Sequence, residues 1–290
     1  TLFPYTTLFR SIGRDVPRTD APAKVNGQAV FGIDARPDGC LFAVVARCPV
    51  FGGRVRTWDG SRAEALPGVR RVVPIDAGIA VVADTTWHAE QGRRALEITW
   101  DEGALASLDD ATIRQRLQAA ADAEGRDVRR DGDPARAMAG AARTLEAAYD
   151  LPFLAHATME PMNCTAHVRE DGVDVWAPTQ FQAAPAWMGG GSRGAAARAA
   201  GVPAERVTIH ASPRGGGCGR RSETDFVTEA VQVSKAMGAP VQVAWTREDD
   251  TRHDFYRPAR HHLLAAALDG DGKPLAWSHR VACPSIMARF

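Results

Sequence analysis

The sequence lacks net charge, long apolar runs and paired cysteines, and each absence excludes a class of protein. Its 35 lysines and arginines balance 35 aspartates and glutamates. A neutral chain has no overall field that would draw it to nucleic acid or to an anionic membrane surface. No stretch reaches the ~18 to 20 apolar residues that a membrane span needs. We therefore expect no nucleic-acid partner and no membrane span.

The five cysteines are scattered along the chain and include no C-x-x-C pair. Zinc sites and iron–sulfur clusters commonly use such closely spaced ligands, so we expect neither from this chain alone. A chain of 290 residues can also bury a core without covalent cross-links, which argues against a disulfide framework. Most of the cysteines are expected to be small buried hydrophobic residues.

The two ends of the sequence fit poorly with the rest. Residues 1–11, TLFPYTTLFRS, have neither the basic start nor the apolar segment of a secretion signal. They resemble translated adapter sequence, and we interpret them as a non-native leader. The last residues, 284–290, follow a strand-like run without any stop signal. We expect the chain to be an internal fragment of a longer protein.

Between these ends the composition changes twice. Residues 12–103 combine short β-branched runs with turn signals and two short helical patterns, which predicts an α+β domain. Residues 104–145 are rich in Ala, Arg and Asp, with a helical period at 109–125 and a solvated connector at 129–141. Strand patterns return in residues 146–290. We predict two α+β domains joined by a helical connector.

Three expected elements flank the chemistry discussed below. A strand is predicted at 28–34 and a hairpin at 163–178, where an R-E-D-G turn separates two β-rich runs. A helix is predicted to begin near Ser222, which can cap it, and to end before Gly238. Its apolar stripe consists of Phe226, Ala230, Val233 and Met237.

A glycine loop, ASPRGGGCGRR at residues 211–221, lies between the expected strand Val207–Ala211 and this helix. Glycines allow positive φ and let a ligand approach the main chain. A helix N-terminus adds unpaired N–H groups and a partial positive charge, which together favour an anion. Arg220 and Arg221 are expected to add fixed charge and forked donors.

Two common phosphate motifs do not fit the glycine loop. A P-loop needs a lysine after its last glycine, but Arg220 stands five residues after Gly215 and no lysine follows. A dinucleotide fingerprint that starts at Gly215 or Gly217 finds Arg220 or Ser222 where its last glycine belongs. The simplest alternative is a glycine-rich turn with solvent-facing arginines.

Four separated motifs resemble the molybdopterin-binding large subunit of the xanthine dehydrogenase and aldehyde oxidase family, most like the isoquinoline 1-oxidoreductase β-subunit type. They are LPFLAHATMEPMNCTAHV at 151–168, WAPTQ at 176–180, the glycine loop, and TREDDTRHDFYRPA at 246–259. Residues 12–103 are similar to the family's α/β hammerhead domain. The resemblance implies an α+β fold in which this hammerhead precedes the first part of a molybdopterin-binding domain.

The resemblance also implies a pterin-dithiolene molybdenum cofactor, in the form of molybdopterin cytosine dinucleotide, held through its own sulfurs and not by a protein metal ligand. Main-chain amides of the glycine loop would face its oxo ligands, and the glutamine of the T-Q pair would hydrogen-bond one of them. By position the implied cofactor-binding residues are Gln180, Gly215, Gly216, Gly217, Cys218, Gly219, Arg220 and Arg221. Cys218 departs from the family pattern, which usually has a pocket-walling phenylalanine there.

The activity that the resemblance implies is oxidative hydroxylation of an N-heteroaromatic or aldehyde substrate with oxygen from water. Electrons would leave through the pterin to a separate [2Fe-2S] subunit. The family's base glutamate is expected in a C-terminal segment outside this sequence, so we assign no catalytic residue and expect the chain alone to be inactive. Such relatives are often exported, which predicts a periplasmic location.

Two other functions stay open from the sequence. One is a non-catalytic module that retains the loop for a phosphorylated ligand, and the other is a hammerhead domain that mainly docks partner subunits. Metal content separates the first of these from the enzyme.

Other polar clusters have ordinary structural explanations. His156 and Glu160 could form an acid–base pair, but a hydrogen-bonded core position is favoured. His261 and His262 are adjacent on an expected strand, so their rings point to opposite faces and cannot share a metal. The acidic residues at 248–250 alternate with arginines and are interpreted as solvated salt links in a loop. His167, His210 and His253 lack a partner at ligand-like spacing.

Overall fold

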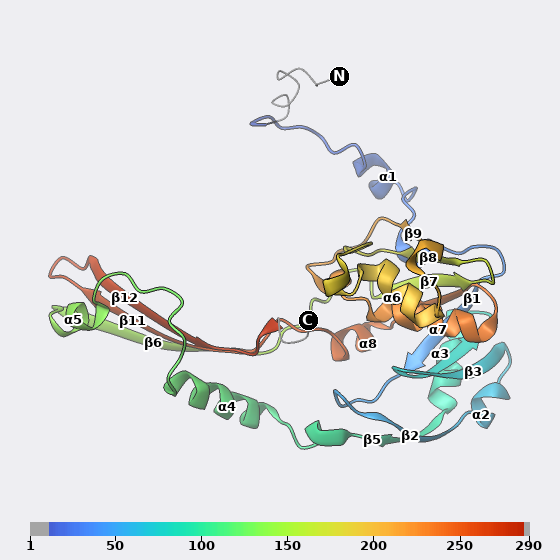
Figure 1. The fold of residues 1–290 in the computed structure, drawn as a ribbon, viewed down its shortest axis with the longest axis horizontal. Helices are drawn as coiled ribbons and strands as arrows, with labels where there is room; N and C mark the ends of the chain where they lie inside the picture. Colours follow the sequence, from blue (N-terminus) through green and yellow to red (C-terminus); the bar gives the residue numbers. More distant parts are fainter. Residues whose placement is uncertain (1–11, 287–290) are drawn as a thin grey trace.

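The structure, a computed structural model, describes residues 12–286 (Figure 1). The predicted non-native leader at 1–11 lies outside the described residues. Strands of the described chain form a seven-stranded, a three-stranded and a two-stranded sheet, and helices pack on the first two. The α+β fold class predicted from the sequence is confirmed.

The seven-stranded sheet combines strands from both predicted domains. Its order is β3 (Val69–Ile75), β4 (Gly78–Ala83), β1 (Leu41–Ala46), β10 (Val241–Ala244), β7 (Asn163–Val168), β8 (Val173–Ala177) and β9 (Val207–Ala211). The two halves meet where β1 pairs in parallel with β10. The division into 12–103, 104–145 and 146–290 stays a prediction, and the structure adds that its outer segments share one sheet.

Helices cover this sheet with small and apolar side chains. α7 (Asp225–Met237) packs on β7 and against α6 (Gly191–Ala200), while α3 (Thr86–Ala95) packs on β1 and β4. The predicted stripe of α7 is buried in the main core at Phe226, Ala230 and Val233, as its 3.6-residue period requires. The helix starts at Asp225 rather than near Ser222, because a 3-10 turn, Arg220–Ser222, ends in an extended residue at Glu223.

A three-stranded sheet projects from the main body on the left of Figure 1. It pairs β12 (Pro274–Ala282), β11 (Arg260–Leu268) and β6 (Arg143–Leu151), and α4 (Asp110–Asp122) and α5 (Pro134–Ala139) pack on it. The predicted hairpin of β11 and β12 and the helix expected at 109–125 are confirmed. The solvated connector expected at 129–141 instead contains α5, whose first turn is capped by Asp133.

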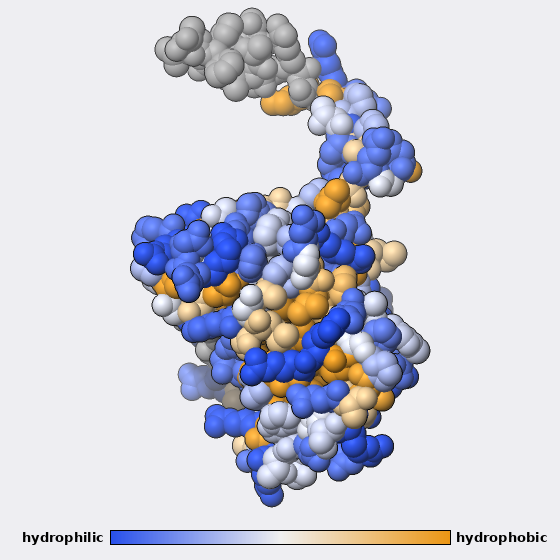
Figure 2. Space-filling view, turned by 90° about the vertical axis from the view of Figure 1, so that its right-hand side faces the viewer, coloured by the Kyte–Doolittle hydropathy of each residue, from blue (hydrophilic) through white to orange (hydrophobic). Residues whose placement is uncertain are grey.

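The remaining elements are short. β2 (Arg54–Asp59) pairs with β5 (Glu97–Asp101), and α2 (Ser61–Glu64) packs beside α3. α1 (Ala21–Val25) precedes β1, and α8 (Arg247–Arg252) follows β10. Figure 1 shows α1 apart from the sheets, and the space-filling view in Figure 2 shows a mostly hydrophilic face with hydrophobic patches between the polar side chains.

The strand predicted at 28–34 does not form. A 3-10 turn, Gly32–Asp34, takes its place, and the Asp34 carboxylate accepts the amide hydrogen of Phe31 at 3.0 Å. A Cβ on Gly32 would lie 2.4 Å from the Pro178 ring and 2.6 Å from Asn163 Oδ1. The segment therefore forms a tight turn that packs against Pro178 and Asn163 and is not a strand.

A buried ion pair joins β1 to α7. Arg47 Nε lies 3.0 Å from Glu229 Oε1, and Trp245 Nε1 donates to the same carboxylate at 2.9 Å. Burial raises the pKa of Glu229 above its ordinary value, although Arg47 acts in the opposite direction. This pair lies within the core, and the ring of Trp245 also lies 5.3 Å from Cζ of Arg220.

At Gly92, helix α3 packs closely against the seven-stranded sheet. A Cβ at this position would lie 2.6 Å from Val81 Cγ1 and 3.1 Å from Val69 Cγ2. We predict that Gly92→Ala destabilises the fold by ~1 to 3 kcal/mol, because overpacking outweighs the better helix propensity of alanine. Urea unfolding measures this, with Arg94→Ala on the exposed face of the same helix as the control. A more stable Gly92→Ala variant would contradict the packing seen here.

Candidate functional site

The glycine loop and the T-Q pair meet because two strands end side by side. β8 and β9 are parallel neighbours, with Ala177 opposite Ala211. Parallel strands bring their carboxyl ends to one edge of a sheet, which is where ligand sites of such sheets commonly form. Pro178, Thr179 and Gln180 follow one strand and the loop follows the other. Sheet topology alone thus places Gln180 beside the loop.

Each glycine of the loop is required for a different reason. Gly216 and Gly219 have φ of 101° and 99°, a region that favours glycine. A Cβ on Gly217 would lie 2.4 Å from Gln180 Oε1, and a Cβ on Gly215 would lie 2.6 Å from Glu160 Cβ. Cys218 adopts φ of 52° although it has a side chain, and it is exposed. The loop is therefore fixed in one conformation by close neighbours.

Hydrogen bonds divide the loop amides into two groups. Gly215 N–H donates to Glu160 Oε2 at 2.7 Å, and Gly219 N–H donates to Gln180 Oε1 at 3.1 Å. Between them, the amides of 216–218 make no hydrogen bond to any of residues 12–286. The Nε2 group of Gln180 is likewise without a partner in this part of the chain. Three consecutive amides and one carboxamide remain as unused donors.

Both arginines point into the protein, and their assignment as cofactor-binding residues stays a prediction. Arg220 is 1% exposed and Arg221 is 0% exposed. Arg220 donates to both oxygens of Asp225 at 2.9 and 2.7 Å, and its Nε lies 2.9 Å from Asp254 Oδ1. Burial opposes the charge, yet Asp225 and Asp254 together raise the pKa of Arg220. A buried guanidinium needs such partners, and Asp225 and Asp254 supply them on the protein side of the loop.

Arg221 points into the protein in the same way. Its Nε donates to the carbonyl of Gly216 at 2.9 Å, and its Nη2 donates to the carbonyl of Glu160 at 2.6 Å. Burial lowers the pKa of Arg221, and the carboxylates of Glu160 and Asp250 act in the opposite direction. Nothing in the loop's own residues indicates this orientation, because Glu160 lies 61 residues away.

His156 and Glu160 have separate partners, as the structural interpretation requires. The Nδ1 atom of His156 lies 2.9 Å from Asp254 Oδ2, and that aspartate is 1% exposed. Glu160 instead bonds the glycine loop. Sequence reasoning found the M-E-P-M-N segment but missed that its glutamate anchors the loop.

The remaining candidate residues do not build a metal site. His261 pairs with Asp150 at 2.7 Å and His262 with His279 at 2.8 Å, so adjacent rings do point to different neighbours. Within residues 12–286 no group of three or more His, Cys, Asp or Glu side chains is placed to hold a metal ion. The described residues also include no helix long and apolar enough to cross a membrane.

The acidic residues at 248–250 were predicted to form solvated salt links in a loop. The structure instead places them in α8. Thr246 caps this helix by accepting the amide hydrogen of Asp249 at 3.1 Å. Asp250 is 2% exposed and lies 2.7 Å from Arg247 Nη1. A capping threonine before three acidic residues is a helix-start signal that the sequence interpretation overlooked.

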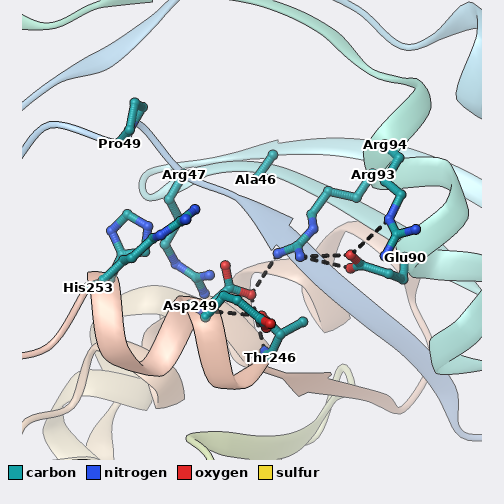
Figure 3. Close-up of a pocket in the computed structure, with 11 residues that line it drawn as sticks. Ala46, Arg47, Pro49, Glu90, Arg93, Arg94, Thr246, Asp249 and His253 are labelled. Carbon is teal, nitrogen blue, oxygen red and sulfur yellow. Dashed lines mark hydrogen bonds and ion pairs between the residues drawn. The ribbon is translucent and has the colours of Figure 1, made fainter.

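A pocket of about 570 Å³ is lined by residues of α3 and α8 and by residues at the end of β1 (Figure 3). Its charges compensate each other, because Arg93 contacts Asp249 at 2.6 Å and Glu90 at 2.9 Å. None of its lining residues belongs to the glycine loop or to 176–180. The unused donors of the loop therefore lie elsewhere, outside this pocket.

Comparison with known proteins decides the family. The model of the molybdopterin cofactor-binding domain matches residues 116–285, which include the whole glycine loop. The chain belongs to the molybdopterin cofactor-binding domain family. The predicted resemblance to xanthine dehydrogenase and aldehyde oxidase proteins is thereby confirmed.

Several curated proteins are similar over nearly the whole chain. The beta subunit of isoquinoline 1-oxidoreductase from Brevundimonas diminuta is 30% identical over 99% of this chain and 37% of its own length. A nicotinate dehydrogenase subunit from Pseudomonas putida is 28% identical over 96% of this chain and 23% of its own length. Across the four curated relatives the chain spans 23% to 38% of the relative's length.

Solved structures share the fold. Quinoline 2-oxidoreductase from Pseudomonas putida 86 has a TM-score of 0.70 at 19% identity, over 93% of this chain and 39% of that one. Aldehyde oxidoreductase from Desulfovibrio gigas has the same TM-score at 18% identity, over 92% of this chain and 34% of that one. The α+β architecture is thus that of molybdenum-containing hydroxylases.

The residues of the loop fit the cofactor that gives this family its name. Unused amides at 216–218 and the free Gln180 Nε2 are donors only, which suits oxygen atoms bound to a metal. A side chain at Gly217 would fill the space against Gln180. The roles of Gln180, Gly215 and Gly219 toward a cofactor stay predictions.

Gly217→Ala tests the contact between the loop and the T-Q pair. The added methyl group must displace the Gln180 carboxamide, which costs the Gly219 to Gln180 hydrogen bond and ~1 kcal/mol of stability. Amide hydrogen exchange at Gly219 should rise while exchange in β1 and β4 stays unchanged. Gly270→Ala is the matched control, since a Cβ there meets nothing within 4 Å. Unchanged exchange at Gly219 would contradict the contact.

His253 gives the pocket of Figure 3 a pH dependence. Burial, and then the charge of Arg47, lowers the pKa of His253 to about 4. An unfolded histidine has a pKa of ~6.5, so the folded state binds fewer protons between these values. The stability due to neutral His253 is complete above about pH 6.5 and is lost toward about pH 4. His253→Asn should narrow the difference in Tm between about pH 7 and about pH 5, and a difference as large as that of the wild type would contradict the lowered pKa of His253.

Proposed function

We propose that this chain is the cofactor-holding part of a molybdenum hydroxylase large subunit that hydroxylates an N-heteroaromatic or aldehyde substrate with oxygen from water. The observation that carries the proposal is the set of unused donors, the amides of 216–218 and Gln180 Nε2, at the shared edge of β8 and β9. The family match supports the cofactor, and the names of the relatives support the class of substrate.

The chain's own task in this proposal is to bind and orient. The amides of 216–218 would donate to oxygen ligands of the cofactor, and Gln180 Nε2 would donate to another. When bound, the molybdenum cofactor supplies the two-electron oxidation and the activated oxygen. The loop adds N–H dipoles without a competing metal ligand, and such fixed donors need no reorganisation during the reaction.

Three finer points belong to the same proposal. The cofactor is the cytosine dinucleotide form, electrons pass to a separate [2Fe-2S] subunit, and the assembly is periplasmic. Three of the relatives are named as one subunit of an enzyme, which supports a partner chain. The scattered cysteines also leave the cluster to that partner.

Metal analysis tests the proposal. The protein expressed from its native gene, in a host that makes the molybdenum cofactor, should carry about one molybdenum atom per chain. Gln180→Met should lower turnover of an N-heteroaromatic substrate by about 10-fold to 1,000-fold, because it removes one positioned donor. Gln182→Met is the matched control, since Gln182 is exposed and lies just past the site.

The result also separates the alternatives. A folded protein without molybdenum, made under conditions in which the cofactor is present, would favour the non-catalytic module. A Gln182→Met variant as impaired as Gln180→Met would remove the role assigned to Gln180.

A further inference from the structure

Glu160 is the one carboxylate that hydrogen-bonds the main chain of the glycine loop among residues 12–286. It is 8% exposed, and its two oxygens face four donors from three segments of the chain. Oε1 accepts from the amide of Ile33 and from Asn163 Nδ2, each at 3.0 Å. Oε2 accepts from the amide of Gly215 at 2.7 Å and lies 3.3 Å from Arg221 Nη2. Each of these contacts needs an acceptor at position 160.

The main chain of Glu160 reinforces the same contact. Its amide donates to the carbonyl of Gly215 at 3.0 Å, so Glu160 and Gly215 bond each other in both directions. Its carbonyl accepts from Arg221 Nη2, and Arg221 Nε in turn holds the carbonyl of Gly216. Hydrogen bonds from Glu160 and Arg221 thus fix the backbone of Gly215 and Gly216.

This fixation determines which amides are left for a ligand. With Gly215 N–H turned down to Glu160 and Gly219 N–H turned to Gln180, the peptide units between them present their N–H groups unpaired. Gly216 and Cys218 are exposed and solvent can reach them, so the cost of an unpaired donor falls on the buried amide of Gly217, and a loop without the anchor would rearrange to pair it. The anchor also holds the backbone next to Cys218, whose φ of 52° is uncommon for a residue with a side chain.

We propose that Glu160 is a positioning residue that presets the donor amides of 216–218, with Arg221 as its partner. It acts through the loop and not by touching the ligand. The inference rests on the proposed function for the identity of that ligand, but not for the effect on the loop. A buried Glu160 is therefore part of the site although it lies 55 residues before Gly215.

Glu160→Gln is the sharpest test, because it keeps the size of the side chain and replaces one acceptor with a donor. An NH2 group must then face either the Gly215 amide with Arg221 or the Ile33 amide with Asn163. Hydrogen exchange at the amides of Gly215 and of residue 160, which are paired in the wild type, should rise by about tenfold or more in protein made without molybdate, while β1 and β4 keep wild-type protection. In protein made with molybdate, the release of molybdenum on dilution should accelerate by about tenfold.

Two variants with the same chemical change serve as controls. Glu229→Gln breaks the buried pair with Arg47 in the core, so it reports what loss of a buried charge does to global stability. Glu170→Gln lies in the exposed turn between β7 and β8. Neither should change exchange at the amides of Gly215 and of residue 160 relative to the rest of the sheet.

Arg221→Lys keeps the inference testable if Glu160→Gln does not fold. It preserves the charge but cannot reach the carbonyls of Gly216 and Glu160 together, so exchange in the loop should rise by a smaller factor. Wild-type exchange in the loop for both variants would overturn the proposal. A rise in Glu229→Gln equal to that in Glu160→Gln would also overturn it, since the effect would then be global.

Molybdenum content distinguishes this inference from the proposed function. If wild-type protein holds molybdenum and Glu160→Gln releases it at the wild-type rate, the positioning role is overturned and the function stands. If wild-type protein never holds molybdenum but loop exchange rises in Glu160→Gln alone, the proposed function fails and the anchoring of the loop by Glu160 is supported.

Discussion

The burial of two guanidinium groups beneath the glycine loop is the constraint from which the site follows. A charge taken out of water is costly unless it is paired and hydrogen-bonded. Arg220 pairs with Asp225 and Asp254, and Arg221 pairs with the Glu160 carboxylate and three backbone carbonyls. These partners are fixed in the fold, so the loop that carries the arginines has one position. The glycines permit that position, and the buried charges select it.

Sheet topology then brings the second half of the site to the loop. Because β8 and β9 are parallel, the chain must cross back between them, and α6 makes that crossing. Both strands end at the same edge, where Thr179 Oγ1 and the amide of Gln180 bond the carbonyl of Arg221. The T-Q pair is thus held by the residue that also holds Gly216. Loop, glutamine and anchor form one connected hydrogen-bonded unit.

Local sequence patterns predicted several helices and strands, but they could not predict the contacts between segments that are distant in the sequence. The stripe on α7 and the hairpin of β7 and β8 follow from the spacing of apolar and turn residues, whereas the need for glycine at 215 and 217 depends on contacts with Glu160 and Gln180. The direction of Arg221 depends on Glu160, 61 residues earlier, and the turn at Gly32 depends on Pro178. An arginine beside a glycine loop can face a ligand or a buried carboxylate, and the sequence of the loop is the same in both cases. The difference lies in the partner segment.

The inward direction of the arginines changes how the site would attract its ligand. The charges of Arg220 and Arg221 are neutralised locally, so these two arginines do not draw an anion to the loop over a long range. What remains are N–H dipoles at 216–218 and Gln180 Nε2, whose attraction is short-ranged and depends on direction. Such donors discriminate by the position of acceptor atoms more than by total charge. A phosphate offers several oxygens that consecutive backbone N–H groups can bind, just as a metal-bound oxygen does, so the donors of the loop suit both kinds of ligand. The match to the molybdopterin cofactor-binding domain, and not the charge of the loop, is what supports the molybdenum cofactor as its ligand.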